Sequence, residues 1–357
     1  MSAVSPGSRL AELLGVEHPI VLGPFGGLSS VELTAAVSEA GGLGSFGLYG
    51  YDAARILETA RAIRERTARP FALNVWLPLD DVQPDAVTAD DYARYVAALQ
   101  PFFDELGVEA PAQPERYLPS SDEQLDAILQ ARPAVASVVY GVPAGEFVTE
   151  AHARGILVVG TATTVDEARA LEAGGVDAIV ATGSEAAGHR VSFLAPAEAS
   201  LVGTFALIPQ VVDAVGVPVV AAGGIADRRG VAAAFALGAS GVQVGTAFLA
   251  TAQSAANDAH RRAIREAPAN GTVLTRAMSG RLARGVPNRA IRRIEEGGVI
   301  APFPVQNWLT GTFRAEATAR GVADLQSLWA GQAAALATRT DAADVFAELR
   351  EGVPADA

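Results

Sequence analysis

The sequence predicts an α/β protein of the (β/α)8, or TIM-barrel, class with an inserted segment and a C-terminal helical cap. Short apolar runs rich in β-branched residues alternate with runs of helical period almost from the start of the chain. This alternation is the pattern of a parallel sheet with crossover helices. Eight apolar runs can be counted, and several end in glycine just before a helical run. Eight βα units make a closed barrel.

The expected strands follow one another at intervals that leave room for a helix. In chain order they are Ile20 to Leu22, Leu43 to Phe46, Phe71 to Val75, Ala136 to Tyr140, Ile156 to Gly160, Ala178 to Ala181, Val219 to Ala222 and Val242 to Gly245. The expected helices between them include Ser30 to Ala40, Ala53 to Thr67, Gly145 to Ala153, Val165 to Ala173 and Gly230 to Leu237.

Two regions depart from this repeat. Residues 79–133 are rich in proline and acidic residues, contain one helical run from Asp91 to Leu106, and predict an insertion on or beside the catalytic face. Beyond Thr251 the alternation ends, and residues 253–357 predict a mainly helical cap. Its helical runs are Ala255 to Glu266, Phe313 to Arg320 and Asp324 to Ala337, around a strip rich in glycine and arginine, Ser279 to Arg293. The barrel itself is assigned to residues 10–78 and 134–252.

The composition excludes several kinds of chemistry. The net charge of −13 argues against a nucleic-acid surface, because phosphate backbones are bound by clustered positive charge. All 27 basic residues are arginine, so Schiff-base, pyridoxal phosphate and Walker-type sites lack their lysine. Cysteine is absent, which excludes disulfides, thiolate nucleophiles and iron–sulfur ligation. A small organic substrate is the remaining expectation.

Neither end of the chain suggests a membrane or an export route. The N-terminal residues have no basic start and no apolar core of a signal peptide, and no apolar run approaches the roughly 18 residues of a membrane span. We therefore expect a cytoplasmic protein without a membrane partner. The sequence leaves open whether it forms a homo-oligomer.

His189 is the candidate catalytic residue. The stretch T-G-S-E-A-A-G-H, Thr182 to His189, follows an expected strand and carries this histidine into a loop lined by glycine and alanine. An imidazole with an ordinary pKa near 6.5 suits proton transfer, and active sites of such barrels lie on the loops after the strands. The other histidines, His18, His152 and His260, are interpreted as ordinary surface or core residues.

Two consecutive strand ends predict an anion cradle. Gly223 and Gly224 end the seventh expected strand, and Gly245 and Thr246 end the eighth. The loops after these two strands frequently bind phosphate in (β/α)8 enzymes, through backbone amides at helix starts. The alternative is that these glycines only form tight turns. Their occurrence at adjacent strand ends favours the phosphate site.

Further residues near strand ends could contact a ring system. Asn74, near the end of the third expected strand, can offer a donor and an acceptor to a planar heterocycle, or be a satisfied core residue. Gly23, Pro24 and Phe25 end the first strand and could line the face of a ring, or only form a turn. No metal site is expected, because no metal-binding spacing surrounds His189. Glu185 is interpreted as a residue that orients the loop, with a solvated side chain as the alternative.

These segments, in this order, resemble the nitronate monooxygenases, formerly called 2-nitropropane dioxygenases, and more distantly the flavin-dependent enoyl-ACP reductases. The matching segments are H-P-I-V-L-G-P, A-A-V-S-E-A-G-G-L-G, R-P-F-A-L-N-V, V-V-G-T-A-T-T-V-D-E-A, G-S-E-A-A-G-H-R, A-A-G-G-I-A-D-R-R-G, G-V-Q-V-G-T-A-F-L and S-G-R-L-A-R-G-V. They extend over nearly the whole chain. Relatives with the S-G-R-x-A-R-G strip and a long insertion after the third strand look closest.

The resemblance implies a non-covalent FMN at the barrel mouth. It places the FMN phosphate at the expected cradle, which is Gly223, Gly224, Gly245 and Thr246, with Gln243 and Val244 in the same run. It also makes Asn74 a flavin contact and His189 the catalytic histidine, which takes a proton from the carbon beside the nitro group or stabilises a bound nitronate. The flavin then takes an electron from the nitronate, oxygen reacts, and a carbonyl compound and nitrite form.

Three positions depart from the family pattern. Thr182 stands where relatives commonly have glutamine, Ala187 replaces a glycine, and Phe25 replaces a methionine. The resemblance implies that all three face the reactive ring, and Gly188 completes the expected cofactor contacts. Trp76 and Tyr140 add bulk near the same mouth, unless they pack in the core. The resemblance therefore carries over the cofactor more safely than the substrate.

The leading hypothesis is an FMN-dependent nitronate monooxygenase that oxidises small alkyl nitronates with O2, with nitroalkanes left open as substrates. One alternative is an FMN reductase that uses NAD(P)H to reduce enoyl thioesters or quinones on the same barrel. The other is a flavin-binding protein without turnover. The physiological substrate is not determined by the sequence.

Overall fold

A computed structural model describes residues 6–79 and 87–355. Residues 80–86, at the start of the expected insertion, and 356–357, at the end of the expected cap, lie outside the described residues. The main sheet has eight parallel strands in the order β1-β9-β8-β6-β5-β4-β3-β2. They are β1 (Ile20–Leu22), β2 (Gly44–Gly47), β3 (Phe71–Trp76), β4 (Val135–Val139), β5 (Leu157–Ala162), β6 (Ala178–Thr182), β8 (Val219–Ala222) and β9 (Gly241–Val244).

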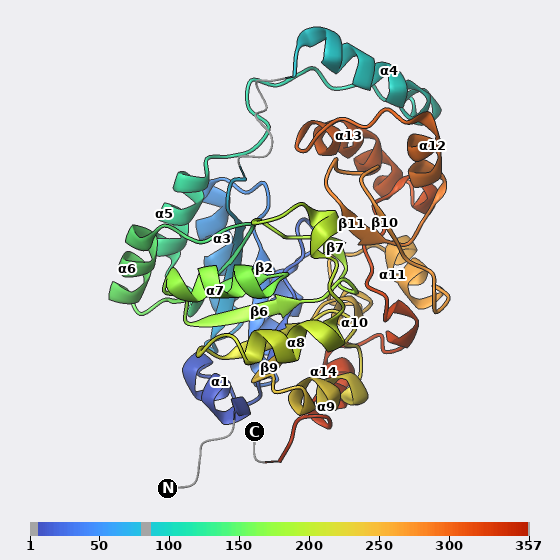
Figure 1. Cartoon of the computed structure of the whole chain (residues 1–357). Helices are drawn as coiled ribbons and strands as arrows, with labels where there is room; N and C mark the ends of the chain where they lie inside the picture. Colours follow the sequence, from blue (N-terminus) through green and yellow to red (C-terminus); the bar gives the residue numbers. More distant parts are fainter. Residues whose placement is uncertain (1–5, 80–86, 356–357) are drawn as a thin grey trace, which may run out of the picture.

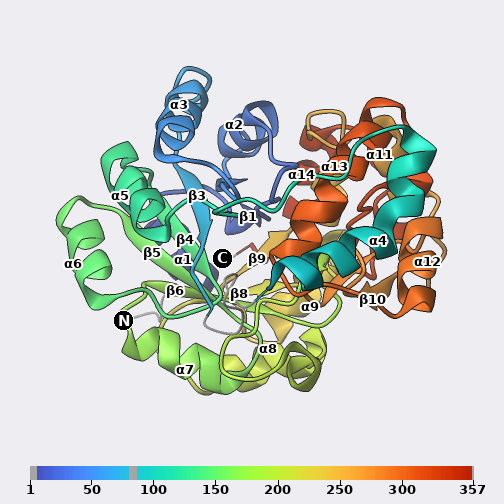
Figure 2. The same ribbon diagram turned by 90° about the horizontal axis from the view of Figure 1, so that it is seen from above.

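The two ends of this sheet meet. The Leu43 amide donates to the Ile20 carbonyl over 2.9 Å, and the Leu22 amide donates to the Leu43 carbonyl over 2.9 Å. These bonds link β1 to the residue before β2 and bring the eight strands round into a barrel (Figure 2). All eight expected strands are present, and the predicted barrel is confirmed.

The crossover helices surround the strands (Figure 2). The five expected ones are α2 (Val31–Glu39), α3 (Ala53–Arg64), α6 (Gly145–Ala153), α7 (Val165–Ala173) and α9 (Arg228–Ala236). Most start at a residue whose side chain accepts from the first-turn amides: Ser30 caps α2, Asp52 caps α3, and Thr164 caps α7. Asp227 caps α9 in the same way.

Three further helices, which were not expected from the sequence, complete the outer layer. They are α5 (Ser121–Ala131), α8 (Thr204–Val212) and α14 (Ala342–Arg350). Helix α5 lies within the expected insertion but packs against α3 and β3, so it is the crossover between β3 and β4. Helix α14, almost at the end of the chain, packs between α2 and α9 on the barrel wall.

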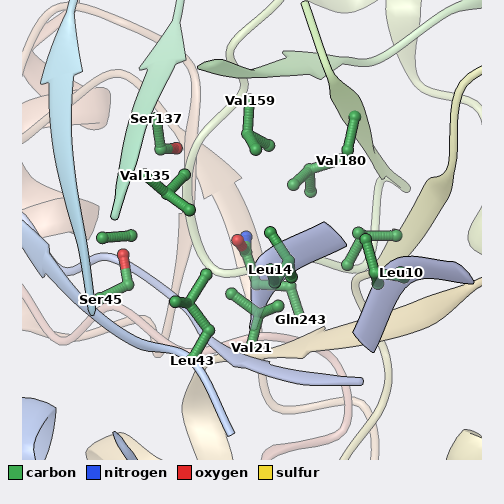
Figure 3. A pocket seen from close by; sticks show the side chains of 13 residues that line it. Leu10, Leu14, Val21, Leu43, Ser45, Val135, Ser137, Val159, Val180 and Gln243 are labelled. Carbon is green, nitrogen blue, oxygen red and sulfur yellow. The ribbon is translucent and has the colours of Figure 1, made fainter. Parts of the chain in front are cut away.

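The N-terminal mouth of the barrel is closed by α1 (Pro6–Leu14). Leu10 and Leu14 of this helix point up into the bore, where they meet a ring of strand side chains such as Val159 (Figure 3). The void left there is only about 20 Å³, close to the space of one water molecule. This end of the barrel therefore has no room for a ligand of cofactor size, unlike the opposite mouth, where the carboxyl ends of the strands lie.

A second hydrophobic core lies above that opposite mouth. It is formed by α4 (Ala89–Leu106) from the expected insertion and by α12 (Arg289–Gly297) and α13 (Val305–Ala319) from the expected cap (Figure 1). Phe102 of α4 stacks on Phe313 of α13 with ring centroids 5.1 Å apart. Glu105 accepts two hydrogen bonds from Arg289, both 2.6 Å long. Two segments separate in sequence thus share one layer, while the domain boundaries themselves stay a prediction.

Several helices lie in the expected cap, but the expected helix from Asp324 to Ala337 is wrong. Two short 3-10 turns, η3 (Ala323–Leu325) and η4 (Ala334–Leu336), flank an irregular stretch instead. The backbone of this stretch bonds to barrel and cap loops: the Gln332 amide donates to the Glu185 carbonyl over 2.9 Å, and the Gly331 amide to Thr246 Oγ1 over 2.9 Å. These tertiary bonds replace the ones that a local helix would have formed.

The remaining elements are short. They are α10 (Thr246–Leu249), α11 (Asp258–Arg265), η2 (Ala197–Ser200) and a three-stranded antiparallel sheet in the order β10 (Val273–Thr275), β11 (Ala283–Gly285) and β7 (Gly188–His189). Helix α11 and the C-terminal half of α13 occupy the other two expected helical runs of the cap. No helix in residues 6–79 and 87–355 is long and apolar enough to cross a membrane.

We predict that Gly331→Ala destabilises the protein by about 1–3 kcal/mol, because an added methyl group overpacks this contact. A Cβ at Gly331 would lie 2.8 Å from the Glu185 carbonyl oxygen and 3.3 Å from Thr246 Oγ1. Equilibrium unfolding in urea measures the effect. The matched control is Gly297→Ala at the exposed end of α12, where a Cβ meets nothing within 4 Å and no loss is expected. Equal unfolding midpoints for the two variants would contradict the prediction.

Candidate active site

One large pocket, of about 380 Å³, opens at the carboxyl ends of the barrel strands. All but one of the site residues that the sequence predicts line it, and the thirteen are Gly23, Pro24, Phe25, Asn74, Thr182, Ala187, Gly188, His189, Gly223, Gly224, Gln243, Gly245 and Thr246. The exception is Val244, whose side chain is fully buried in the hydrophobic core. Its carbonyl accepts from the Gly23 amide over 2.8 Å, so Val244 fixes the turn after β1 through its backbone.

The turn after β8 leaves its backbone bare toward the pocket. Gly223 and Gly224 have φ angles of +100° and +72°, in the left-handed region that glycine adopts without strain. A Cβ on Gly223 would lie 3.0 Å from Thr204 Oγ1 and 3.2 Å from the Ala186 amide nitrogen. Both residues therefore have a conformational reason to be glycine, and Gly223 also has a steric one.

Glu185 orients the loop beside this turn. Both of its carboxylate oxygens accept from the Thr204 amide over 2.9 Å, and Oε2 also contacts Thr204 Oγ1 at 2.9 Å. Thr204 Oγ1 in turn lies 3.0 Å from the Gly223 carbonyl. The carboxylate thus ties the loop after β6 to the start of α8 and to the turn after β8, in agreement with the orienting role expected of it.

His189 lies on the wall of the pocket in a cage of aromatic rings. Its ring centroid is 5.0 Å from that of Trp76 and 5.7 Å from that of Trp329. Nε2 is 2.8 Å from Ser279 Oγ, which fixes the orientation of the imidazole. Desolvation lowers the pKa of His189 to about 3, and the nearby charges of Arg281 and Arg314 add to this effect. The imidazole is therefore neutral at pH 7 and able to accept a proton.

Backbone pairing with the glycine- and arginine-rich strip holds His189 in place. In the small sheet, Ala283 of β11 pairs with His189 of β7, and Arg284 pairs with Gly188. The Arg284 Nε donates to the Ser184 carbonyl over 2.9 Å. The strip that the sequence analysis singled out, Ser279 to Arg293, thus fixes both the backbone and the ring of the histidine.

The side chain of the next residue, Arg190, holds the same loop through hydrogen bonds to its carbonyls. Its side chain is buried, NH1 donates to the Gly183 carbonyl over 2.6 Å, and NH2 donates to the Thr182 and Ser200 carbonyls over 3.1 and 3.2 Å. Burial lowers the pKa of Arg190 to about 10, so it stays charged at pH 7. The loop that carries His189 is therefore closed on itself by one guanidinium.

Asn74 is both a core residue and a pocket residue. Its side chain is 2 % exposed, and Nδ2 donates to Ser137 Oγ on β4 over 3.0 Å. The interpretation as a satisfied core residue is confirmed, and a contact from Asn74 to a ring system stays a prediction. Trp76 also lines the pocket, whereas Tyr140 is 1 % exposed and packs in the core.

Several pocket residues were missed by the sequence analysis. Tyr49 follows β2, Asn307 and Arg314 lie on α13, and Trp329 and Gly331 belong to the irregular stretch of the cap. Sequence patterns indicate that α13 is a helix but not which of its polar residues turn toward the barrel. Ser279 was flagged only as the first residue of the strip.

The other polar groups near the barrel have ordinary partners. His152 bonds to Asp177 over 2.9 Å, and His260 bonds to the Trp329 carbonyl over 2.9 Å. The ring of His18 packs against Phe346, with centroids 5.9 Å apart. Among the described residues, no group of three or more histidines and acidic residues could hold a metal ion.

Comparisons with known proteins identify relatives over the full barrel and cap. The family model described as "Nitronate monooxygenase" matches residues 7–352. The chain is 38 % identical over 349 residues to a protein named "Probable nitronate monooxygenase" from Staphylococcus aureus (strain Newman), a match that covers 96 % of each chain.

Solved structures give the same result. The structure of a nitroalkane oxidase from Streptomyces ansochromogenes superposes with a TM-score of 0.85 and 36 % identity, over 97 % of this chain and 99 % of the other. FabK from Thermotoga maritima superposes with a TM-score of 0.74 and 29 % identity, over 96 % of this chain and 94 % of the other. With a family model that spans almost the whole chain and a barrel mouth that brings His189 to the glycine turns, the chain belongs to the nitronate monooxygenase family of oxidoreductases.

Proposed function

We propose that this protein is an FMN-dependent nitronate monooxygenase that oxidises small alkyl nitronates with O2 to a carbonyl compound and nitrite. The observation that carries the proposal is that a neutral His189 and two glycine-rich strand ends line one pocket. The first suits proton transfer at carbon, and the second suits a phosphate group. Family membership supports both assignments, because the family is typically flavin-dependent.

The residues of the pocket fit FMN. A volume of about 380 Å³ lies within the usual range of roughly 300–1,000 Å³ for cofactor and ligand sites. In the proposal, the phosphate binds at the cradle of Gly223, Gly224, Gly245 and Thr246, and the ring system contacts Gly23, Pro24, Phe25, Asn74, Thr182, Ala187, Gly188 and Gln243. A side chain at Gly223 or Gly224 would press on Thr204 or on the loop that carries Glu185 and would strain the left-handed turn that forms the cradle. FMN would supply the electron acceptor, which no side chain of this chain provides.

The protein itself would contribute the position of the His189 imidazole and the environment around it. His189 holds a neutral imidazole beside the reacting carbon, and Ser279 and β11 keep that imidazole in one orientation. Trp76 and Trp329 pack around the ring and keep water from it. This arrangement binds a small apolar group near a single proton acceptor.

The environment of His189 favours nitronates over neutral nitroalkanes. A group whose pKa is lowered to about 3 is a weak base, and proton abstraction from carbon is most efficient when the pKa of the base is close to the working pH. A nitronate has already lost its carbon-bound proton, so it makes no such demand. The positive charges of Arg281 and Arg314 near His189 also favour an anionic substrate.

We predict that the purified protein is yellow with bound FMN and that it releases nitrite and consumes oxygen with propyl-2-nitronate. His189→Asn should lower kcat/KM for neutral 2-nitropropane by about 100-fold or more, in line with the loss of an acid–base group, and should change kcat/KM for the nitronate much less, because the nitronate needs no proton removal from carbon. The matched control is His152→Asn, whose imidazole pairs with Asp177 on the outer wall, and which should retain wild-type activity.

Other outcomes distinguish the alternatives. Colourless protein that does not bind FMN would contradict the cofactor assignment. Anaerobic bleaching of the flavin by NADH, without nitrite formation from the nitronate, would favour the reductase of enoyl thioesters or quinones. Bound FMN that no donor reduces, in the wild type and in His189→Asn alike, would favour a flavin-binding protein without turnover.

A second prediction concerns pH and stability. Because the pKa of His189 is about 3 in the folded protein and near 6.5 in the unfolded chain, only the unfolded chain takes up this proton between these values. This contribution is absent above pH 6.5, and stability falls as the pH drops below it. Wild type should therefore lose about 1–2 kcal/mol more than His189→Asn between pH 7 and pH 5. Urea unfolding at both pH values measures this, and parallel losses would contradict the lowered pKa.

A further inference from the structure

Arg314 brings a positive charge to the pocket, and no carboxylate in residues 6–79 and 87–355 pairs with it. Its NH1 donates to Ser327 Oγ over 2.8 Å, and its NH2 donates to the carbonyl of Asn307 over 3.0 Å and to Asn307 Oδ1 over 2.7 Å. The Nε is buried without a hydrogen-bond partner. Within the part of the chain that the structure describes, the only titratable group that favours its charge is the phenol of Tyr49.

An unbalanced guanidinium at such a place is costly. Burial lowers the pKa of Arg314 to about 10, which leaves it charged at pH 7 but shows that its surroundings disfavour the charge. Two other arginines beside the pocket have carboxylates close by: Arg190 has Glu167 and Glu185, and Arg284 has Glu185. A buried charge is normally paired, and a ligand with the opposite charge would complete this one.

The hydrogen bonds of Arg314 determine the direction of a donor on Tyr49. Because a guanidinium only donates, the Asn307 atom at 2.7 Å from NH2 must be the amide oxygen. The amide nitrogen of Asn307 then donates to the Tyr49 hydroxyl oxygen over 2.9 Å. The hydroxyl hydrogen of Tyr49 has no acceptor among the described residues. All three residues line the pocket. The Tyr49 hydroxyl, at the end of this chain of hydrogen bonds, can therefore donate to a ligand there.

Tyr49 and His189 share the same aromatic neighbours. The ring of Trp76 lies 4.4 Å from that of Tyr49 and 5.0 Å from that of His189, and Phe303 contacts both rings at 6.2 and 6.3 Å. The charge of Arg314 also acts on His189. Tyr49 and Arg314 therefore stand on the histidine side of the pocket.

We propose that Tyr49 and Arg314 are the substrate-recognition residues that bind the negatively charged oxygens of the nitronate while His189 faces its carbon. Asn307 is a positioning residue, because it acts by orienting the Tyr49 hydroxyl and holding the guanidinium. The inference rests on the proposed function for the identity of the anion. Under this inference, the protein binds the singly charged, planar nitronate group, which has two oxygens, more tightly than the neutral nitroalkane.

Binding of nitrate and of 2-nitropropane to the flavin-bound protein tests the proposal without turnover. Nitrate is a planar oxyanion, and 2-nitropropane is the neutral parent of propyl-2-nitronate. In isothermal titration calorimetry, Arg314→Met should raise the Kd of nitrate by about tenfold or more, because it removes a charge-assisted hydrogen-bond donor. The Kd of 2-nitropropane should stay within about threefold. Tyr49→Phe should raise the Kd of nitrate by about fivefold, as expected for one lost donor.

Asn307→Asp separates a recognition role from a structural one. The new carboxylate would pair with Arg314 and accept the Tyr49 hydroxyl hydrogen, so it should raise or maintain the thermal midpoint while it weakens nitrate binding about tenfold. If Arg314 only stabilises the fold, the midpoint should rise and the Kd of nitrate should not change. This variant supplies the test even where Arg314→Met fails to fold.

The controls and the opposing results are as follows. Arg314→Lys keeps the charge and should recover part of the nitrate affinity. Arg61→Met removes an arginine whose side chain is 72 % exposed on α3, and should change neither Kd. Equal loss of nitrate and 2-nitropropane affinity in Arg314→Met, or unchanged nitrate affinity in both Tyr49→Phe and Asn307→Asp, would overturn the inference. Wild-type protein that binds nitrate through Arg314 but does not turn over nitronates would overturn only the proposed function.

Discussion

The seating of the C-terminal cap on the barrel mouth is the contact on which the site depends. A (β/α)8 barrel by itself presents the loop after β6 as a free connection, and a free loop cannot hold a histidine in one orientation. Here β11 pairs with β7, Ser279 bonds to the imidazole, and Gly331 packs against the Glu185 carbonyl. The barrel supplies the glycine turns, and the cap supplies the rigidity of the catalytic side.

Two arginines with similarly lowered pKa values show how differently a buried charge can be used. Arg190 donates to three carbonyls and has Glu167 and Glu185 nearby, so its charge is balanced inside the loop that it ties together. Arg314 is held by neutral oxygens of Asn307 and Ser327, and among the described residues it has no such carboxylate. A chain without lysine thus assigns arginine both to the scaffold and to the pocket, and the position of the carboxylates tells the two uses apart.

The barrel could be predicted from the sequence because its strands obey local rules. The apolar runs are short, most are rich in β-branched residues, and many are bounded by glycine or a helix cap, so both their type and their place in the repeat can be predicted. The glycine turns and His189 follow from the same rule, since they stand where such strands end. Helix α5 was hidden in a segment rich in proline and acidic residues, and the stretch from Asp324 to Ala337 has a helical pattern that contacts with Glu185 and Thr246 override.

The cap half of the site could not be predicted for a physical reason. Asn307 and Arg314 are polar residues two turns apart on α13, and sequence alone does not distinguish a polar face toward solvent from one toward a pocket. Their roles appear only when Tyr49, more than two hundred residues earlier in the chain, is brought against them. Contacts between residues so far apart in the chain produce no pattern in the neighbouring sequence.

The electrostatics of the pocket connect substrate binding to the basicity of His189. The charges of Arg281 and Arg314 both lower the pKa of His189. An anion bound at Tyr49 and Arg314 would offset part of that positive charge and would place a negative charge close to the imidazole, and both effects raise the pKa of a histidine. His189 would therefore be a weak base in the free protein and a stronger one in the complex. Under the proposed function, the anionic substrate itself tunes the group that faces its carbon, while a neutral molecule leaves that group unchanged.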